Sequence, residues 1–369
     1  MRKVLTLFTL LALMGMALPL MAQDEEAAET PEPVIEWECP EGFAGQTLNV
    51  WNWATYIGET TISTFEELCG VSVVYDVYDS NEALIARLRQ GNPGYDVAFP
   101  GEYAIAILVR DGLLEQIDTG AIPNYENIDE QWLGLYFDPD EEYSVPYLWG
   151  TFGVAYNVNV VEEPITSWEQ VWAHEGAVVW VDDPRSILGI GLLLLGYDPN
   201  SDDRDEIFEA AEYILANSGN VVAFAADDGQ AQLARGDADI ALEYSGDVFQ
   251  IIADCECDDF VYVLPDEGSI ADVAAMVLLK DAPNPELALV FMDYILDPGV
   301  MSLIVMDVLY PTTNRAAIES GFIPDEILNN PVIFPSSEIQ ERLFLLEDVG
   351  EAEQAYNDAW DEILIFGGN

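Results

Sequence analysis

Apolar and polar positions alternate along the first part of the chain in two patterns, short strand-like runs and stretches with helical spacing. We expect strands at Thr47–Trp51, Val71–Tyr75 and Asp96–Phe99, and helices at Ile57–Leu68, Asn81–Arg89 and Tyr103–Asp111. The strand segments are short apolar runs, whereas the helix segments repeat apolar residues every three or four positions. Strands that alternate with helices predict a parallel sheet covered by helices.

The same alternation returns in the second part of the chain. Its expected elements are Ala177–Val181, Ser186–Leu195, Asp205–Ala216, Val221–Phe224, Gly229–Arg235, Ile240–Tyr244 and Val248–Ala253. We therefore expect two α/β units. In open α/β sheets, the loops at the carboxyl ends of the strands form the binding crevice. This rule selects the loops Asn52–Tyr56, Pro100–Tyr103, Asp182–Ser186 and Tyr244–Asp247.

The first 22 residues have the pattern of a secretory signal peptide. A positively charged start is followed by an apolar run from Val4 to about Leu20 and by the small residue Ala22. A membrane anchor is the alternative, but Gly15 and Pro19 interrupt the run and no stop-transfer segment follows it. We expect cleavage near Ala22 and a mature protein outside the cytoplasm, in the periplasm or its equivalent.

Residues 23–39 are rich in Glu, Ala and Pro, which predicts an acidic, disordered linker. The rest of the chain has the length of two ordinary domains, and a hydrophobic content of 50% is ample for two cores. Its longest late apolar run, Ile187–Leu195, is too short to cross a bilayer, so we expect no membrane span.

The net charge of −58 changes the list of possible partners. Binding to nucleic acid or to an anionic membrane needs clustered Lys and Arg, so both are poor partners, and we expect no nucleic acid to bind. Because acids are spread along the whole chain, we interpret most of the charge as an acidic, soluble surface. Attraction of cations toward a cleft is the second explanation.

Four cysteines in an exported chain indicate disulfides. Cys39 precedes the first strand and Cys69 ends the first helix, so we expect these two to pair. Cys255 and Cys257 are separated by one residue, which gives a strained ring if they pair. Metal binding is the alternative for them, but no second Cys or His pair supports it.

The predicted crevice loops carry the strongest resemblance to known proteins. The segments concerned are Asn52–Tyr56, Tyr78–Glu82, Tyr95–Pro100 with Tyr103, Tyr143–Gly150, Asn157, Thr166–Trp168, Asp182–Asp183 and Tyr310–Asn314. In order and spacing they resemble the spermidine/putrescine-binding proteins of bacterial ABC transporters, from about Leu48 to the C-terminus.

The resemblance implies a two-lobed periplasmic binding protein fold of type II, in which each lobe is a sheet covered by helices and the ligand lies in the cleft between them. Lobe one is then expected at 40–148 plus 272–317, and lobe two at 149–271 plus 318–369. The implied function is capture of a polyamine for uptake through an ABC transporter permease. We expect a monomer that needs no cofactor and holds no metal.

The family's aromatic clamp falls on Trp53, Tyr56 and Tyr103, and aromatic faces do attract ammonium groups. Core packing is the alternative role for each ring. A ligand carboxylate of the family falls on Asp183, which is also placed to cap the following helix. Two further aromatic residues belong to the implied site. Tyr244 stands where the family has Trp, and Tyr310 matches a ligand-facing Tyr.

Two acids of the family are missing from this chain, which bears on the choice of ligand. Their positions hold Ser186 and Ala274, and the family's aromatic residue two before the latter is Asp272. Positions 272 and 274 face the same side of a strand, so Asp272 is the first candidate to compensate, and Asp247 the second. A neutral or zwitterionic solute is the alternative ligand.

Enzymatic chemistry finds little support in the sequence. No G-x-S-x-G motif, phosphate-binding loop or dinucleotide fingerprint occurs, and His174 is the only histidine. The acids from Asp198 to Glu209 match part of a calcium loop, but Asp203 occupies the position that needs glycine. An exported enzyme on the same scaffold is therefore the weakest hypothesis.

Overall fold

The computed structural model describes residues 30–226, 228–255 and 258–367. Ten strands form a curled sheet, with its main path in the order β2-β1-β3-β9-β4-β7-β5-β6 while β10 pairs with β9 and β8 with β4. The strands are β1 (Thr47–Asn52), β2 (Ser72–Val77), β3 (Val97–Ala98), β4 (Ser144–Asn157), β5 (Val178–Val181), β6 (Val221–Ala225), β7 (Ile240–Tyr244), β8 (Phe260–Val263), β9 (Ser269–Leu278) and β10 (Leu343–Leu345).

The sheet has a parallel group of strands at each end and two long antiparallel strands between them. In the first half of the molecule β1 pairs in parallel with β2 and β3, and in the second half β5 pairs in parallel with β6 and β7. Strands β4 and β9 run antiparallel to each other and join the two halves. The expectation of a parallel sheet is thus correct for each end and wrong for the centre, where the sheet is mixed.

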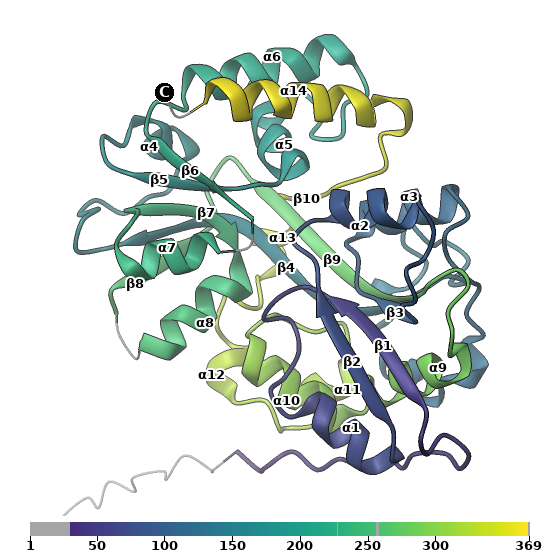
Figure 1. Cartoon of the computed structure of the whole chain (residues 1–369). Helices are drawn as coiled ribbons and strands as arrows, with labels where there is room; N and C mark the ends of the chain where they lie inside the picture. Colours follow the sequence, from purple (N-terminus) through teal and green to yellow (C-terminus); the bar gives the residue numbers. More distant parts are fainter. Residues whose placement is uncertain (1–29, 227, 256–257, 368–369) are drawn as a thin grey trace, which may run out of the picture.

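Helices cover both halves (Figure 1). They are α1 (Thr61–Cys69), α2 (Asn81–Leu88), α3 (Glu102–Arg110), α4 (Trp168–Ala173), α5 (Pro184–Leu195), α6 (Arg204–Ala216), α7 (Gly229–Arg235), α8 (Ser245–Cys255), α9 (Pro285–Ile295), α10 (Pro298–Val308), α11 (Arg315–Glu319), α12 (Asp325–Leu328), α13 (Ser337–Gln340) and α14 (Glu353–Phe366). Short 3₁₀ turns occur at Thr119–Ala121, Pro123–Asn127, Glu130–Trp132 and Gly350–Ala352. The last helix, α14, packs on α5 and α6, so the C-terminal segment belongs to the second half.

Where the sequence predicted elements, the structure places them within a few residues. The helix expected at Ile57–Leu68 begins only at Thr61, because the residues after β1 form a turn in which Thr55 adopts a positive φ of 48°. Helix α7 and strand β7 have the expected bounds. The acidic linker expected at 23–39 does not reach Trp37, whose indole is buried and donates to Asp293 at 2.7 Å.

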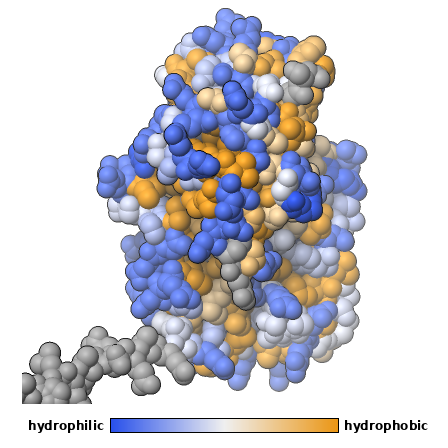
Figure 2. Space-filling view, turned by 90° about the vertical axis from the view of Figure 1, so that its left-hand side faces the viewer, coloured by the Kyte–Doolittle hydropathy of each residue, from blue (hydrophilic) through white to orange (hydrophobic). Residues whose placement is uncertain are grey.

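Hydrophilic side chains are spread over the surface rather than gathered in one place. Hydrophilic side chains cover both halves on the face shown in Figure 2, with apolar patches between them. Among the described residues no single helix is long and apolar enough to cross a membrane; α9 and α10, bent by 76° where they meet, pass that test only as a pair.

The expected disulfide between Cys39 and Cys69 is present, with Cα atoms 5.2 Å apart. It ties the segment before β1 to the end of α1. Cys255 is also disulfide-bonded, which removes the metal alternative for its thiol, whereas Cys257 lies outside the described residues.

Replacing both Cys39 and Cys69 with serine is expected to lower the free energy of unfolding by about 3–4 kcal/mol, because the bridge closes a loop with a sequence separation of 30. Chemical denaturation of the oxidised proteins measures the difference. An unchanged denaturation midpoint would show that the bridge contributes nothing to stability.

Candidate functional site

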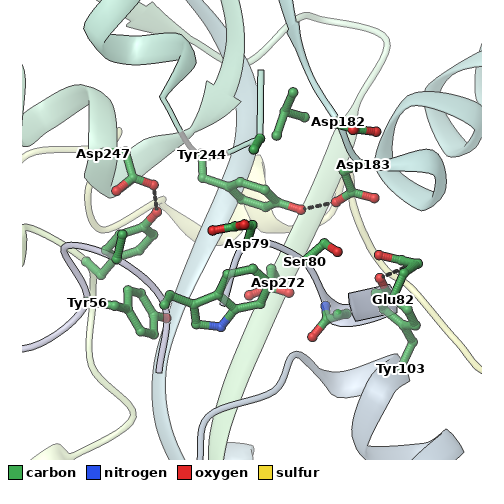
Figure 3. A pocket seen from close by; sticks show the side chains of 16 residues that line it. Tyr56, Asp79, Ser80, Glu82, Tyr103, Asp182, Asp183, Tyr244, Asp247 and Asp272 are labelled. Carbon is green, nitrogen blue, oxygen red and sulfur yellow. Dashed lines mark hydrogen bonds between the residues drawn. The ribbon is translucent and has the colours of Figure 1, made fainter. Parts of the chain in front are cut away.

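A pocket of about 640 Å³, counted with its open mouth, lies between the two halves (Figure 3). All eight residues predicted from the sequence line it: Trp53, Tyr56, Tyr103, Asp183, Tyr244, Asp247, Asp272 and Tyr310. They come from the loops after β1 and β5, from the last residue of β7, from α3 and α8, from β9 and from the segment after α10. The structure therefore brings together every predicted site residue, including those far apart in the chain.

The loop after β1 supplies the aromatic wall of the first half. The indole N–H of Trp53 donates to the carbonyl oxygen of Phe99 at 2.8 Å, which fixes the ring at the carboxyl end of β3. Tyr78 packs on the same indole with ring centroids 4.5 Å apart. Tyr56 is buried and meets Tyr310 edge to face at 4.8 Å. These contacts hold the rings in place before any ligand arrives.

Asp247 forms an acidic end of the pocket and connects the two halves. Only 7% of this residue is exposed, and its carboxylate accepts from Tyr310 Oη at 2.6 Å and from Thr55 Oγ1 at 2.9 Å. Burial raises the pKa of Asp247 above its ordinary value. The positive φ of Thr55, uncommon outside glycine, belongs to the turn that brings this hydroxyl to Asp247.

Asp183 caps a helix, as expected, and its carboxyl group lines the pocket. It caps α5 by accepting from the backbone N–H groups of Arg185 at 2.9 Å and Ser186 at 3.0 Å, and Pro184 at the first helical position favours this start. Its other oxygen accepts from Tyr244 Oη at 2.6 Å and from Ser186 Oγ at 3.0 Å. Ser186, at a position where the resemblance implies an acid, thus donates to Asp183 instead.

Asp272 lies on β9 in the middle of the pocket wall. Burial raises its pKa to about 6, the carboxylate of Asp183 adds to this rise, and a hydrogen bond with Glu102 opposes it. Ala274, at the position where the resemblance implies an acid, is buried two residues further along the same strand. An acid is therefore present on the expected face, displaced by two positions.

Glu82 is a pocket residue to which the sequence analysis gave no role. It lies in the first turn of α2 and accepts from Tyr103 Oη at 2.8 Å. Burial, followed by the charge of Asp183, raises the pKa of Glu82 to about 7. The signal was available, because Glu82 follows the carboxyl end of β2 and such loops form the crevice. Asp79 of the same loop also lines the pocket and is exposed.

The arrangement suits a slender cation. Aromatic rings face the cavity, and carboxyl groups are spaced along it, at Asp247, Asp272, and Asp183 with Glu82. Among the described residues, neither lysine nor arginine lines this pocket. Ammonium groups separated by methylene spacers would find both kinds of partner here. An anionic solute would meet repulsion at every acidic position.

Two other signals from the sequence have structural roles. His174 contacts Asp239 at 3.0 Å, away from the pocket. Asp198 accepts from the backbone N–H of Asn200, and Asp203 caps α6, so the acids of the partial calcium pattern satisfy backbone donors. Within the described ranges no group of three or more His, Cys, Asp or Glu residues could hold a metal ion.

Ion pairs join the two halves beside the pocket. Arg110 of α3 contacts Asp348 at 2.6 Å, and Arg89, just after α2, contacts Glu353 at 2.8 Å at the start of α14. Both arginines are more than one third exposed. In Figure 1, α2 and α3 lie on the right of the molecule, whereas α8, which carries Asp247, lies on the left.

Comparison with known proteins gives a consistent result. Residues 60–331 match the family described as bacterial extracellular solute-binding protein. The putrescine-binding periplasmic protein SpuD of Pseudomonas aeruginosa is 33% identical over 338 residues, covering 86% of this chain and 92% of the relative. Spermidine/putrescine-binding periplasmic protein 1 of Haemophilus influenzae is 31% identical, with coverage of 87% and 89%. The solved structure of the spermidine/putrescine transporter substrate-binding protein PotD of Streptococcus pneumoniae superposes with a TM-score of 0.73 at 30% identity, covering 87% of this chain and 99% of that one.

Proposed function

Because this chain belongs to the bacterial extracellular solute-binding proteins, with their two-lobed periplasmic binding fold, we propose that it captures a polyamine in the pocket and delivers it to an ABC importer. Relatives with about 30% identity over most of the chain bind putrescine or spermidine. The observation that carries the proposal is the lining of the pocket, which among the described residues contains aromatic rings and carboxyl groups but neither Lys nor Arg.

Each end of a bound polyamine would have its own partners. One ammonium group would contact Asp247, with Tyr56 and Tyr310 beside it. The other would contact Asp183 and Glu82, which lie at the opposite end (Figure 3). Trp53 and Tyr244 would enclose the methylene chain between them. Asp272 would neutralise an ammonium group near the middle of the pocket. It would thereby replace the acid that the resemblance implies at position 274, where this chain has Ala.

The transport role sets the remaining expectations. The chain would act outside the cytoplasm, and the disulfide of Cys39 and Cys69 is consistent with export. The expected signal peptide, residues 1–22, lies outside the described residues. We propose that one lobe comprises 40–148 plus 272–317 and the other 149–271 plus 318–369. We also propose that the protein is a monomer and that closure of the lobes on the ligand is the signal that the permease recognises. No catalytic step is part of this proposal.

Isothermal titration of the mature protein with putrescine, spermidine, spermine and a neutral sugar, at two salt concentrations, tests the proposal. Micromolar or tighter binding of one amine, with selectivity against the others, would support it. Weak binding that grows with ligand charge and disappears in salt would mean nonspecific attraction to the acidic surface, and would refute it. Selective binding of the sugar would favour the alternative of a neutral ligand.

The ion pairs beside the pocket are expected to make a small, salt-sensitive contribution to affinity. Arg110→Gln removes the contact with Asp348, and exposed ion pairs contribute about 0.2–1 kcal/mol. We expect at most about a fivefold loss of polyamine affinity at low salt, and no measurable loss at about 0.5 M salt. Arg235→Gln is the matched control, since Arg235 pairs with Asp237 within the second half. Equal losses in both variants would show a general charge effect.

A further inference from the structure

Glu102 is a buried acid that the proposed binding scheme does not use. It is the first residue of α3, and none of its surface is exposed. Its Oε2 accepts from the backbone N–H of Val273 at 2.8 Å, and its Oε1 accepts from that of Leu346 at 3.0 Å. The carboxyl group is thus fixed where α3, β9 and the segment after β10 meet, behind the wall of the pocket.

The third contact of this carboxyl group is Asp272. The two side chains are hydrogen-bonded to each other. Gly101 allows this approach, because a Cβ atom there would lie only 2.7 Å from Asp272 Oδ1. Asp272 therefore lies against Glu102 and Gly101 on one side, while it also lines the pocket.

Two carboxyl groups in contact cannot both be ionised at low cost, so the pair retains a proton. Burial and the charge of Asp272 raise the pKa of Glu102 well above its ordinary value, whereas the pKa of Asp272 is about 6. These directions favour the proton on Glu102 and the negative charge on Asp272. The titratable groups that face the pair are Asp183, Tyr56, Tyr244 and Tyr136. Asp79 and Glu82 lie further along the pocket, and Arg185 and Glu347 lie beside Tyr136.

We propose that Glu102 is a positioning residue for ligand binding, a neutral buried acid that donates a hydrogen bond to Asp272 and so keeps the Asp272 carboxylate ionised and aimed at a ligand ammonium group. This inference rests on the proposed polyamine function. Glu102 does not touch the ligand and acts only through Asp272. Because Leu346 donates to the same carboxyl group, Glu102 also links this acidic position to the C-terminal segment.

Two substitutions separate the donor role from simple space filling. Glu102→Gln offers an N–H donor to Asp272 and keeps one of the two oxygens that accept from Val273 and Leu346, whereas Glu102→Met has similar length and offers neither donor nor acceptor. Since the hydrogen bond lowers the pKa of Asp272, the Met variant should lose affinity at a higher pH than the wild type. We expect the Met variant to bind putrescine or spermidine about tenfold more weakly than the wild type at pH 6.5, and within about threefold of the wild type at pH 8.5. The Gln variant should keep the wild-type pH profile.

Isothermal titration of the mature proteins between pH 5.5 and pH 8.5 gives these profiles. Glu82 titrates in the same range, but its contribution is common to all three proteins, so the difference between profiles reports Asp272. An unshifted profile for the Met variant, or equal losses for both variants at every pH, would overturn the inference alone. Absence of amine binding by the wild type at every pH would overturn the proposed function as well.

A double-mutant cycle covers the case in which the Met variant does not fold. If Glu102 acts through Asp272, its substitution should matter little once Asp272 is gone. In the Asp272→Asn background, Glu102→Gln should therefore weaken putrescine or spermidine binding less than about twofold, independently of the size of its effect in the wild type. Losses that simply add would show that Glu102 has only a structural role, and would overturn the inference.

Discussion

Asp272→Asn is expected to weaken polyamine binding on the order of 30-fold to several thousandfold. Removing one member of a desolvated charge pair costs about 2–5 kcal/mol, and each 1.36 kcal/mol is a factor of ten. Asp272 lines the pocket, its pKa is raised to about 6 by burial, and no other acid occupies its face of β9. An ammonium group beside it would therefore lose a partner that water does not replace.

Asp79→Asn is the matched control for this variant. Asp79 lines the same pocket but is exposed, so solvent screens its charge. We expect a loss below about fivefold, measured by titration calorimetry under the same conditions. Equal losses for the two variants would mean that the ligand senses only the summed charge of the cleft, and that Asp272 does not compensate for Ala274.

Acidification from pH 7.5 to pH 5 is expected to weaken polyamine binding by about a hundredfold or more. A cationic ligand favours the ionised carboxylates, and these lose their charge as the pH falls through their pKa values. Those values are about 7 for Glu82 and about 6 for Asp272, and the pKa of Asp247 is also raised. The ligand's own ammonium groups stay charged over this range, so the change arises in the protein. Titration calorimetry at constant ionic strength measures it.

The ligand-free protein supplies the control, because its stability should change in the opposite direction. An acid whose pKa is higher in the folded than in the unfolded state binds more protons when folded, so acidification favours folding in that interval. For Glu82 the interval runs from 4.5 to about 7. The midpoint of thermal unfolding without ligand should therefore rise as the pH falls from 8 toward 5. Affinity that does not change with pH would contradict the pKa values on which this prediction rests.

Much of the site followed from the sequence because its residues lie where parallel strands end. The loops at Asn52–Tyr56, Asp182–Ser186 and Tyr244–Asp247 were selected by that rule, and the structure gathers them around one pocket. Asp183 was assigned both a capping role and a pocket role, and both are present. Such features depend on local sequence, on caps and on the direction of strands.

What the sequence did not yield depends on contacts between distant segments. Strands β4 and β9 are buried along nearly their whole length, so they lack the alternation that marks a half-exposed strand. Glu102 resembles any acid in the first turn of a helix until Val273 and Leu346 are placed beside it. Its raised pKa arises from this tertiary environment, which no local pattern encodes.

The two crossing strands also affect how the chain must fold as it is made. In the first half β3 pairs with β1 and with residues 277–278 of β9, so this half completes its sheet only after most of the chain has been synthesised. Pairings between segments so far apart in sequence form slowly, since a long loop must close before they contribute to stability. The sheet of the first half therefore stays incomplete until residues 277–278 have been synthesised.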